Sequence, residues 1–303
     1  MSAVSIRRPS PPVHVRARSG DARFLRMLRD GSFQGHVHSV FERVVNLERA
    51  GGGLFTLAAR DVDDAPHTLV LDLPGFGDSG VEAGERVTAI GGTLAIAGRI
   101  AVDIDTATAW DPTLPPWPDD HTTLGANVAL VRTRGDTLGS AVDERSAFAA
   151  EVTAMLEQRA DALRAALLCG DAEAAVRHGI DMLGLGPGLT PSGDDFLLGL
   201  LAALHVPQGP AGRLAAIGAA IAAAAPRRTH AISVAALEAA ATGRVRASIH
   251  AFVRALMHGR RECLQAALDD VLAIGSTSGA DIVSGVLCGF EVHLQLGKSV
   301  QCQ

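Results

Sequence analysis

Thr190-Pro191-Ser192-Gly193-Asp194-Asp195 and Ser276-Thr277-Ser278-Gly279-Ala280-Asp281 are two copies of one signature, 86 positions apart in a chain of 303 residues. Each copy opens an apolar run, and a glycine follows the last aspartate by four positions. In each copy a hydroxyl, a glycine and a carboxylate stand where a helix should begin, beside amide N–H groups that have no intrahelical partner. We therefore expect one polar helix start to be built twice, in two helix–loop–helix units that face each other around an approximate two-fold axis.

The sequence around these copies, from Asp143 onward, has a helical period and is rich in alanine. The pattern predicts helices at 144–168, 172–183, 195–205, 211–224, 229–242, 246–258, 260–273 and 280–296, several of which end at a glycine. No strand is expected between them. This predicts an all-α bundle over residues 143–297 that carries the glycine-rich motif, followed by a tail at 298–303.

The region before the bundle, residues 36–142, has a short β-like pattern. Runs rich in Val, Ile, Leu and Thr alternate with Gly, Pro and Asp turns, and predict strands at 37–47, 54–59, 68–73, 87–90, 93–96, 99–104 and 126–132. The segment 110–120 holds four prolines and two tryptophans, which predicts an ordered loop that packs on the next domain. We expect an α+β chain, in which an antiparallel β-sheet or barrel packs on the all-α bundle.

The composition excludes several classes of protein. A net charge of −6, a pI near 6.0 and the absence of tyrosine argue against a nucleic-acid-binding surface. The apolar runs are too short to span a membrane. The four cysteines form no Cys-x-x-Cys pair, which is typical of reduced thiols in the cytoplasm. The first 35 residues, rich in arginine and interrupted by prolines, predict a basic N-terminal arm, followed by an early strand or helix, rather than a secretory signal.

A glycine-rich loop precedes the first copy and includes an insertion, residues 187–189, that the second copy lacks. Such a loop can offer several N–H groups to phosphate or carboxylate, and the helix dipole adds to the attraction. No lysine follows the glycines, as a Walker loop would require, and a helix rather than a strand precedes them. The alternative is a tight structural turn, with Ser192 or Asp194 as an ordinary N-cap. The candidate anion-binding residues here are Gly186, Gly188, Thr190, Ser192 and Gly193, with Ser278 and Gly279 in the second copy.

Three aspartates are the candidate catalytic and metal-binding residues. Asp195 and Asp281 are equivalent in the repeat, so that convergent helix starts would let them bind Mg²⁺ or divide the work of a general base. Alternatively, each carboxylate stabilises only its own helix N-terminus. Asp194 has no counterpart in the second copy, which suits a role specific to one ligand.

A basic turn supplies positive charge that the loop lacks. Arg227 and Arg228 can grip phosphate or carboxylate at two points, and Thr229 and Ser233 fall on one face of the helix that follows. A solvated basic turn with Thr229 as its cap is the alternative interpretation. No Gly-x-Ser-x-Gly elbow is present, so covalent serine catalysis is disfavoured.

The run from Gly184 to Gly199, followed by Arg228-Thr229 with Ser233 and by Thr277-Ser278-Gly279 with Asp281, resembles a bacterial family long described as a domain of unknown function. The family carries the label putative carboxylase and includes the AllH-type subunit of oxamate carbamoyltransferase, from anaerobic allantoin breakdown. The resemblance covers most of the chain. It implies a subunit that acts with partner subunits to move a carbamoyl group between oxamate and phosphate.

The sequence thus predicts a subunit of a carbamoyltransferase-like enzyme in purine or nitrogen catabolism, which binds a small anionic substrate at the paired helix starts. Mg²⁺ is expected to bridge the aspartates and a dianionic substrate, because the carboxylates alone would repel the dianion. A second hypothesis is a non-catalytic regulatory or scaffold subunit that binds a nucleotide or metabolite. A carboxylase ranks third, because the chain has neither a biotin-attachment motif nor an ATP-binding loop. All versions of the site require Asp195 and Asp281 to meet.

Overall fold

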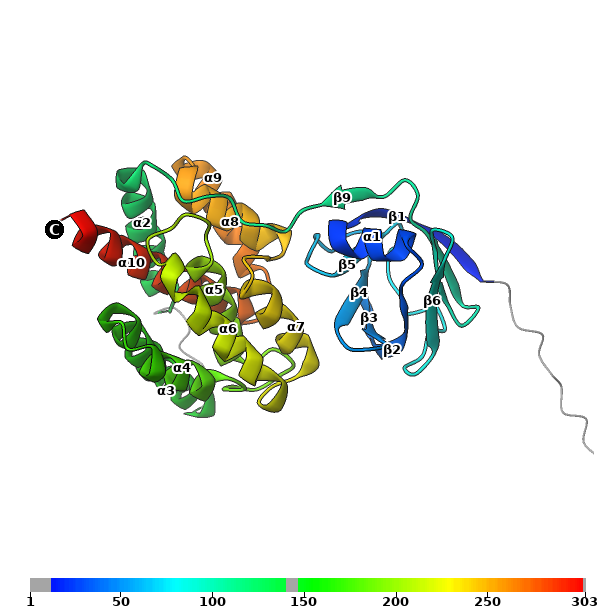
Figure 1. Cartoon of the computed structure of the whole chain (residues 1–303), viewed down its shortest axis with the longest axis horizontal. Helices are drawn as coiled ribbons and strands as arrows, with labels where there is room; N and C mark the ends of the chain where they lie inside the picture. Colours follow the sequence, from blue (N-terminus) through cyan, green and yellow to red (C-terminus); the bar gives the residue numbers. More distant parts are fainter. Residues whose placement is uncertain (1–11, 140–146, 302–303) are drawn as a thin grey trace, which may run out of the picture. The chain divides into compact units, whose positions relative to one another are not determined.

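The computed structural model describes residues 12–139 and 147–301, and the chain divides into two compact units, Met1–Asp111 and Pro112–Gln303. The first unit is rich in strands and the second is helical, so the fold is α+β as expected (Figure 1). The division comes earlier than residue 142, where the β-rich domain was expected to end. The reason is that residues 126–132 are not a strand.

Residues 126–132 lie instead in helix α2 (His121–Gly139). Buried Leu124, Val128 and Val131 recur at helical spacing, and Asp120 accepts hydrogen bonds from the first amides of the helix, those of Thr122 and Thr123, at 3.0 Å each. A short apolar run fits a buried strand or a buried helix equally well, and periodicity over seven residues does not separate the two.

The first unit is a barrel. Its strands are β1 (Val13–Asp21), β2 (Gln34–Val40), β3 (Val44–Arg49), β4 (Leu54–Ala58), β5 (Thr68–Leu71), β6 (Arg86–Ile90), β7 (Thr93–Ile96), β8 (Ile100–Asp103) and β9 (Thr108–Trp110). They follow the order β5-β4-β3-β2-β6-β7-β8-β1-β9, and a pairing of β5 with β1 closes eight of them into a ring. The barrel is confirmed, but the sheet is mixed rather than antiparallel, because the β1–β8, β1–β9 and β4–β5 pairs are parallel.

The segment expected to be a basic arm contributes two elements to this barrel. Residues 13–21 form β1, and α1 (Ala22–Arg29) follows, with Asp21 as its N-cap. Phe24, Leu25 and Leu28 have no exposed area, and the Phe24 ring lies 4.7 Å from that of Phe55 in the barrel core. Only residues 1–11 of the expected arm lie outside the described part. The arginines alternate with apolar residues and stay exposed, and this alternation is the signal of a half-buried element.

The expected strand over 37–47 is a hairpin. It divides into β2 and β3, which turn at residues 41–43, where the Phe41 amide donates to the Val44 carbonyl at 2.8 Å. The remaining predicted strands of the barrel agree with β4 to β8 within about two residues.

The second unit is helical, as expected. Besides α2 it contains α3 (Ala147–Cys169), α4 (Ala172–Met182), α5 (Ser192–Leu204), α6 (Ala215–Ala224), α7 (Ala231–Ala240), α8 (Ala247–His258), α9 (Arg261–Leu272) and α10 (Ser278–Gln301), with short 3-10 turns Gly212–Leu214 and Ala225–Arg227. The last helix extends past residue 297, where the bundle was expected to end, so that much of the predicted tail belongs to α10.

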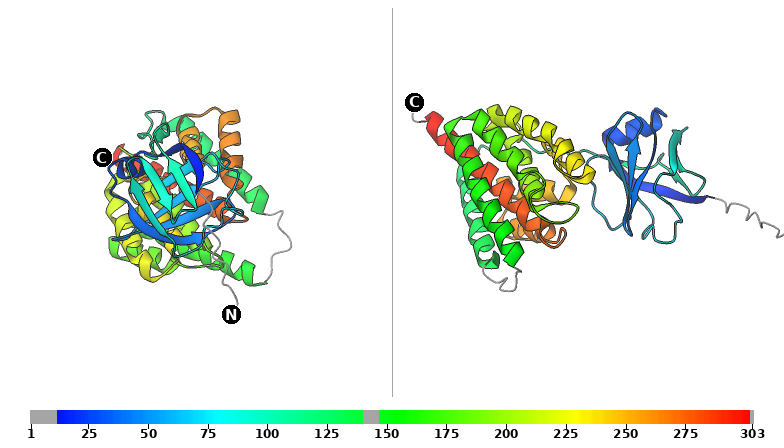
Figure 2. Two further views of the ribbon diagram at one scale, coloured as in Figure 1. Left: turned by 90° about the vertical axis from the view of Figure 1, so that its right-hand side faces the viewer. Right: turned by 90° about the horizontal axis from the view of Figure 1, so that it is seen from below.

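The two helices that begin at the repeated signature, α5 and α10, pack backbone against backbone. A methyl group added at Gly199 would overlap the carbonyl oxygen of Ile282, and one added at Gly285 would overlap that of Phe196. These contacts are reciprocal, since each glycine of one helix meets the equivalent carbonyl of the other. The pair therefore has the approximate two-fold relation that the repeat predicted. In the right view of Figure 2, α10 is the long helix coloured red.

The proline-rich segment after β9 is an ordered loop on the helical unit. The Leu114 amide donates to the Gly243 carbonyl at 3.1 Å, and the Trp117 amide donates to the Pro207 carbonyl at 2.8 Å. The Trp117 ring stacks on His293 of α10, with centroids 4.5 Å apart. This confirms the loop that the prolines predicted.

Candidate functional site

The two copies of the signature begin their helices with the same hydrogen bonds. The Gly193 amide donates to the Leu185 carbonyl at 2.9 Å, and the Gly279 amide donates to the Ile274 carbonyl at 3.0 Å. Side chains at either glycine would overlap backbone atoms of the preceding helix. Pro191 is the N-cap of α5 and gives no side-chain hydrogen bond, so neither Ser192 nor Asp194 is the cap. The glycines are therefore needed for a close approach of backbone, whatever else the loop does.

The side chains of the two helix starts meet. The hydroxyls of Thr190 and Ser278 lie 3.2 Å apart, one from each copy, and both hydrogen bond to the carboxyl group of Asp195. Asp281 is close enough for its charge to act on Asp195. The helix starts thus converge on one place, which is the condition that the site required.

Asp195 is the unusual residue of this cluster. Asp195 is only 5% exposed, and its Oδ2 atom accepts no hydrogen bond from any residue in the described part of the chain. Burial raises the pKa of Asp195 to about 7; the charges of Asp281 and Asp194 raise it as well, and the hydrogen bonds from Ser278 and Thr190 oppose the shift. Near neutral pH this carboxyl group can therefore give or take a proton.

Asp194, the residue before Asp195, accepts a hydrogen bond at each carboxylate oxygen. It is 2% exposed; Oδ1 accepts a hydrogen bond from the Gly184 amide at 2.8 Å, and Oδ2 accepts one from the hydroxyl of Thr229. Both oxygens are thus engaged within the protein, which suits a structural link between the glycine-rich loop and the turn before α7. The second copy has Ala280 at this position and lacks the link. Gly184 was not among the predicted site residues, although it opens the glycine run.

The glycine-rich loop has a backbone that only glycine adopts easily. Gly184, Gly186 and Gly188 have φ values of 75°, 113° and 97°, in the left-handed region. A side chain at Gly186 would also crowd Ser192, whereas Gly188 faces open space. The Leu189 carbonyl at the end of the insertion accepts a hydrogen bond from Ser233 at 3.4 Å.

The basic turn lies directly against this loop. A methyl group at Gly184 would stand 2.5 Å from the Arg228 carbonyl oxygen, and Thr229 is bonded to Asp194. Arg227 and Arg228 are exposed, and neither guanidinium forms an ion pair with a residue that the structure describes. The backbone of the turn is therefore fixed, while its two charged groups remain available to a ligand.

Two family models match this chain. The model of the AllH family N-terminal domain matches residues 16–109, and that of the oxamate carbamoyltransferase subunit AllH matches residues 182–290. The chain belongs to the AllH family. The second match begins at the end of α4 and contains the glycine-rich loop, the basic turn and both helix starts of this AllH-family chain. No solved structure matches the chain.

The three aspartates of the predicted metal site differ in how available their oxygens are to a metal ion. Among residues 12–139 and 147–301, no group of three or more His, Cys, Asp or Glu side chains is placed to hold a metal ion. Asp194 directs both oxygens to protein donors, so a site made by all three aspartates has no support in this AllH-family chain. Binding of Mg²⁺ by Asp195 and Asp281 alone stays a prediction. None of the described helices is both long and apolar enough to cross a membrane.

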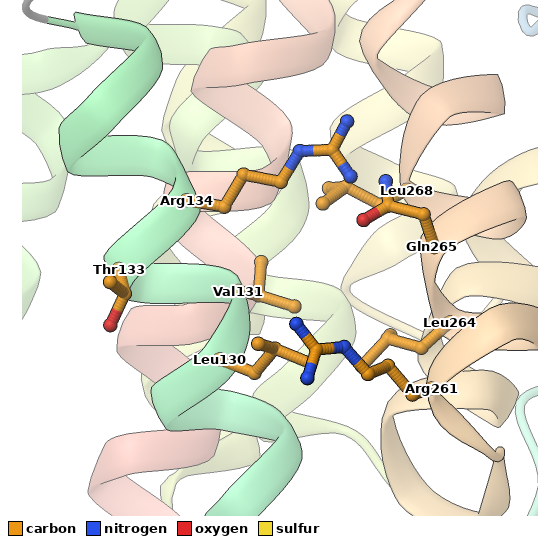
Figure 3. A pocket seen from close by; sticks show the side chains of 8 residues that line it. All are labelled: Leu130, Val131, Thr133, Arg134, Arg261, Leu264, Gln265 and Leu268. Carbon is orange, nitrogen blue, oxygen red and sulfur yellow. The ribbon is translucent and has the colours of Figure 1, made fainter.

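A separate hollow lies between α2 and α9 (Figure 3). It has a volume of about 280 Å³ and an apolar floor, with Arg134 and Arg261 reaching across it, and Arg134 is paired with Asp269 at 3.0 Å. None of the predicted site residues lines it. This hollow could not be predicted from the sequence, because one of its walls is α2, part of which was expected to be a strand.

Proposed function

We propose that this AllH-family chain is a subunit of a carbamoyltransferase-like enzyme and binds a small phosphorylated or carboxylate anion where α5 and α10 begin. The observation that carries the proposal is the convergence of the two helix starts on the buried Asp195. The N-termini of both helices present positive dipole ends there, which favour an anion. The matching family, that of the oxamate carbamoyltransferase subunit AllH, supports the reaction class and the presence of partner subunits.

The division of labour follows from the chemistry of the residues. Amides of the glycine-rich loop and the guanidinium groups of Arg227 and Arg228 hold the anion, because arginine binds phosphate and carboxylate at two points. A nitrogen that receives a carbamoyl group must lose a proton, and a departing nitrogen must gain one. Asp195, with a pKa of about 7, suits either task. A place in purine or nitrogen catabolism is part of the proposal and rests on the family alone.

Mg²⁺ remains a proposed cofactor with a reduced ligand set. Asp195 and Asp281 are oxygen donors of the kind that Mg²⁺ uses, with water and substrate oxygens completing its coordination. If Mg²⁺ is required, anion binding should depend on Mg²⁺ and be abolished by EDTA. Thermal-shift measurements of anion binding in the presence of Mg²⁺ and in the presence of EDTA test this directly.

Thermal shift of the purified chain tests anion binding. Carbamoyl phosphate, phosphate and oxamate are each expected to raise Tm, because a ligand that binds only the folded state stabilises it. The double variant Arg227→Ala/Arg228→Ala should need at least a tenfold higher ligand concentration for the same rise in Tm. Arg213→Ala, on a turn outside the candidate site, should leave the rise in Tm unchanged. A chain that none of these ligands stabilises would contradict the proposal.

Activity distinguishes this function from its rival. In the enzyme assembled with its partner subunits, Asp195→Asn is expected to lower kcat by at least about 100-fold, the usual size of a general acid–base contribution. Ligand binding together with undiminished turnover in Asp195→Asn would instead support the regulatory or scaffold subunit. Circular dichroism of the variant checks that the fold is kept.

A further inference from the structure

The hollow between α2 and α9 shares no residue with the proposed anion site. Both helices pack on α8 and α10, and between them they leave a space of about 280 Å³ (Figure 3). Its apolar lining comes from both walls and consists of Leu130, Val131, Leu264 and Leu268. All but Leu130 are buried members of the core of the helical unit. The floor of the hollow is therefore part of a packed core, which holds its shape.

Two arginines enter the hollow from opposite walls, Arg134 from α2 and Arg261 from α9 (Figure 3). The charge of Arg134 is balanced by Asp269, whose carboxylate accepts hydrogen bonds from the Arg134 guanidinium at 3.0 Å and from the Gln265 amide at 3.1 and 3.2 Å. Arg261 forms no ion pair with any residue in the described part of the chain. One positive charge thus remains beside an apolar floor.

The charge that complements this hollow is a single negative one. A carboxylate carries one negative charge and binds a guanidinium group at two points. A phosphate monoester carries about 1.5 to 2 negative charges near neutral pH, more than the one positive charge of Arg261 that is left to balance. The apolar floor favours an apolar group on the same ligand, because water is displaced from both surfaces. Charge and lining together favour a monocarboxylate with an apolar body.

The size of the hollow favours a small molecule over a protein segment. Small-molecule sites commonly have volumes of about 300 to 1,000 Å³, so that about 280 Å³ suits a compact ligand. A stable protein interface takes about 20–30 residues from each partner, whereas eight residues line this hollow.

We propose that the hollow between α2 and α9 binds a small monocarboxylate with a branched or aromatic apolar body. The carboxylate pairs with Arg261, and the apolar body lies against the floor formed by the leucines and Val131. This goes beyond the proposed function, because it adds a second ligand site to the helical unit. It does not depend on whether the helix starts of α5 and α10 bind an anion.

Three probes separate the contributions of charge and apolar body. Benzoate has both, benzamide keeps the ring without the charge, and acetate keeps the charge without the ring. Isothermal titration of the full-length chain at pH 7 should show benzoate binding at least about tenfold more tightly than either, as expected for the loss of a hydrogen bond to a charged group or of a buried ring. Phenyl phosphate should bind no more tightly than benzoate.

Matched variants locate the benzoate site. Arg261→Gln removes the charge at an exposed position, and the preference for benzoate over benzamide should fall to about threefold or less. Arg260→Gln makes the same change of net charge at the preceding exposed residue, which does not line the hollow, and should keep the preference. The double variant Arg227→Ala/Arg228→Ala should also keep it, because it alters only the proposed anion site.

The opposite results would overturn the proposal. These are equal binding of benzoate and benzamide, no binding of benzoate, or a preference that survives Arg261→Gln. Loss of the preference in Arg227→Ala/Arg228→Ala alone would place benzoate at the helix starts instead. Tighter binding of phenyl phosphate would exclude a monocarboxylate site. If no probe binds and Arg261→Gln prevents assembly with partner subunits, the hollow is a protein interface. The comparison of probes uses the unmodified chain, so it does not depend on the folding of any variant.

Discussion

Asp194 and Asp195 are adjacent in the sequence and have opposite surroundings. Both oxygens of Asp194 accept hydrogen bonds, from the Gly184 amide and the Thr229 hydroxyl, whereas Oδ2 of Asp195 accepts none from the described residues. One step along a helix turns a side chain by about 100°, which is enough to change its neighbours completely. The first carboxylate therefore holds the loop together, and the second is available for chemistry.

Replacement of Asp194 by alanine should destabilise the chain. The change leaves the Gly184 amide and the Thr229 hydroxyl without their acceptor, and buried bonds of this kind cost about 2–4 kcal/mol when one partner is removed. Urea unfolding measures the loss. Asp270→Ala, at an exposed position, should stay within about 0.5 kcal/mol of the natural chain. A similar value for both variants would mean that the Asp194 link contributes little.

Asp195→Asn should have the opposite effect on stability. The pKa of the folded-state carboxyl is raised, mainly by burial, from the ordinary 3.8 to about 7. The folded state therefore binds more protons than the unfolded state between these values, and stability falls as pH rises through this window. Since asparagine carries no charge, the variant should be more stable at pH 8, by at most about 4 kcal/mol. Unfolding curves of both chains at pH 5 and pH 8 check this, and a variant less stable at pH 8 would contradict it.

His293 gives the chain a second dependence on pH, with the reverse sign. The residue is fully buried, accepts the Ala211 amide at Nδ1 and lies 2.9 Å from the Ala203 carbonyl at Nε2, an arrangement that suits a neutral ring. Burial lowers its pKa from 6.5 to about 4. Below pH 6.5 the imidazole is protonated in the unfolded state but stays neutral in the folded state. The free energy of unfolding therefore decreases as pH falls toward 4, by about 3 kcal/mol over the whole range.

A comparison with His293→Gln isolates this contribution, because glutamine can bond but does not titrate. The variant should be less stable at pH 7, yet lose less of its remaining stability between pH 6.5 and pH 4. Equal slopes for the two chains over this range would show that His293 does not titrate on unfolding.

At the scale of elements, the crossing of α5 and α10 decides whether the site exists. Replacing glycine by alanine within a helix usually gains up to about 1 kcal/mol. At Gly199 and Gly285 the new methyl group would instead overlap a backbone carbonyl oxygen of the other helix, which cannot move without separating the two helix starts. We expect Gly199→Ala and Gly285→Ala each to cost about 2–3 kcal/mol, within the range of overpacked cores, and to weaken oxamate binding.

Gly125→Ala is the matched control for this crossing. Gly125 also lies within a helix, α2, but an added methyl group there meets no atom within 4 Å. The substitution should be neutral or stabilising in thermal unfolding. If all three glycine variants behaved alike, the close packing of α5 on α10 would not be what holds the helix starts together.

The elements also show how far the sequence could predict the structure. The duplicated signature predicted two equivalent helix starts because the beginning of a helix depends mainly on residues that are close together in the sequence. It set Asp194 apart only as the aspartate without a counterpart in the second copy. It could not show which carboxylate is fully hydrogen bonded, since the partners Gly184, Thr229 and Ser278 come from other segments. An early strand or helix was expected after the basic arm, but β1 was not placed within residues 13–21, because the arginines there outweighed their alternation with apolar residues. The parallel β1–β8 pairing joins segments that no local pattern relates.

At the scale of the whole molecule, the residues that the structure describes form two hydrophobic cores that share no residue. One comprises buried residues of the barrel, from Ala17 to Ala107, and the other comprises residues of the helical unit, from Leu114 to Leu296. Every predicted site residue belongs to the second unit. The family match shows that the barrel is part of the family's architecture. None of the predicted site residues lies in the barrel.

This division makes a prediction about the helical unit alone. A fragment of residues 112–303 retains one complete core, the proline-rich loop that packs on it, and both helix starts. It should therefore fold cooperatively, with the helical circular dichroism of that unit, and bind oxamate within about threefold of the full chain, because affinity follows the contacts that the ligand makes. The partner fragment, residues 1–111, should fold as a barrel and bind no oxamate. If the helical fragment folds but loses oxamate binding, then residues of the barrel complete the site, and the assignment of substrate recognition to the two helix starts alone is wrong.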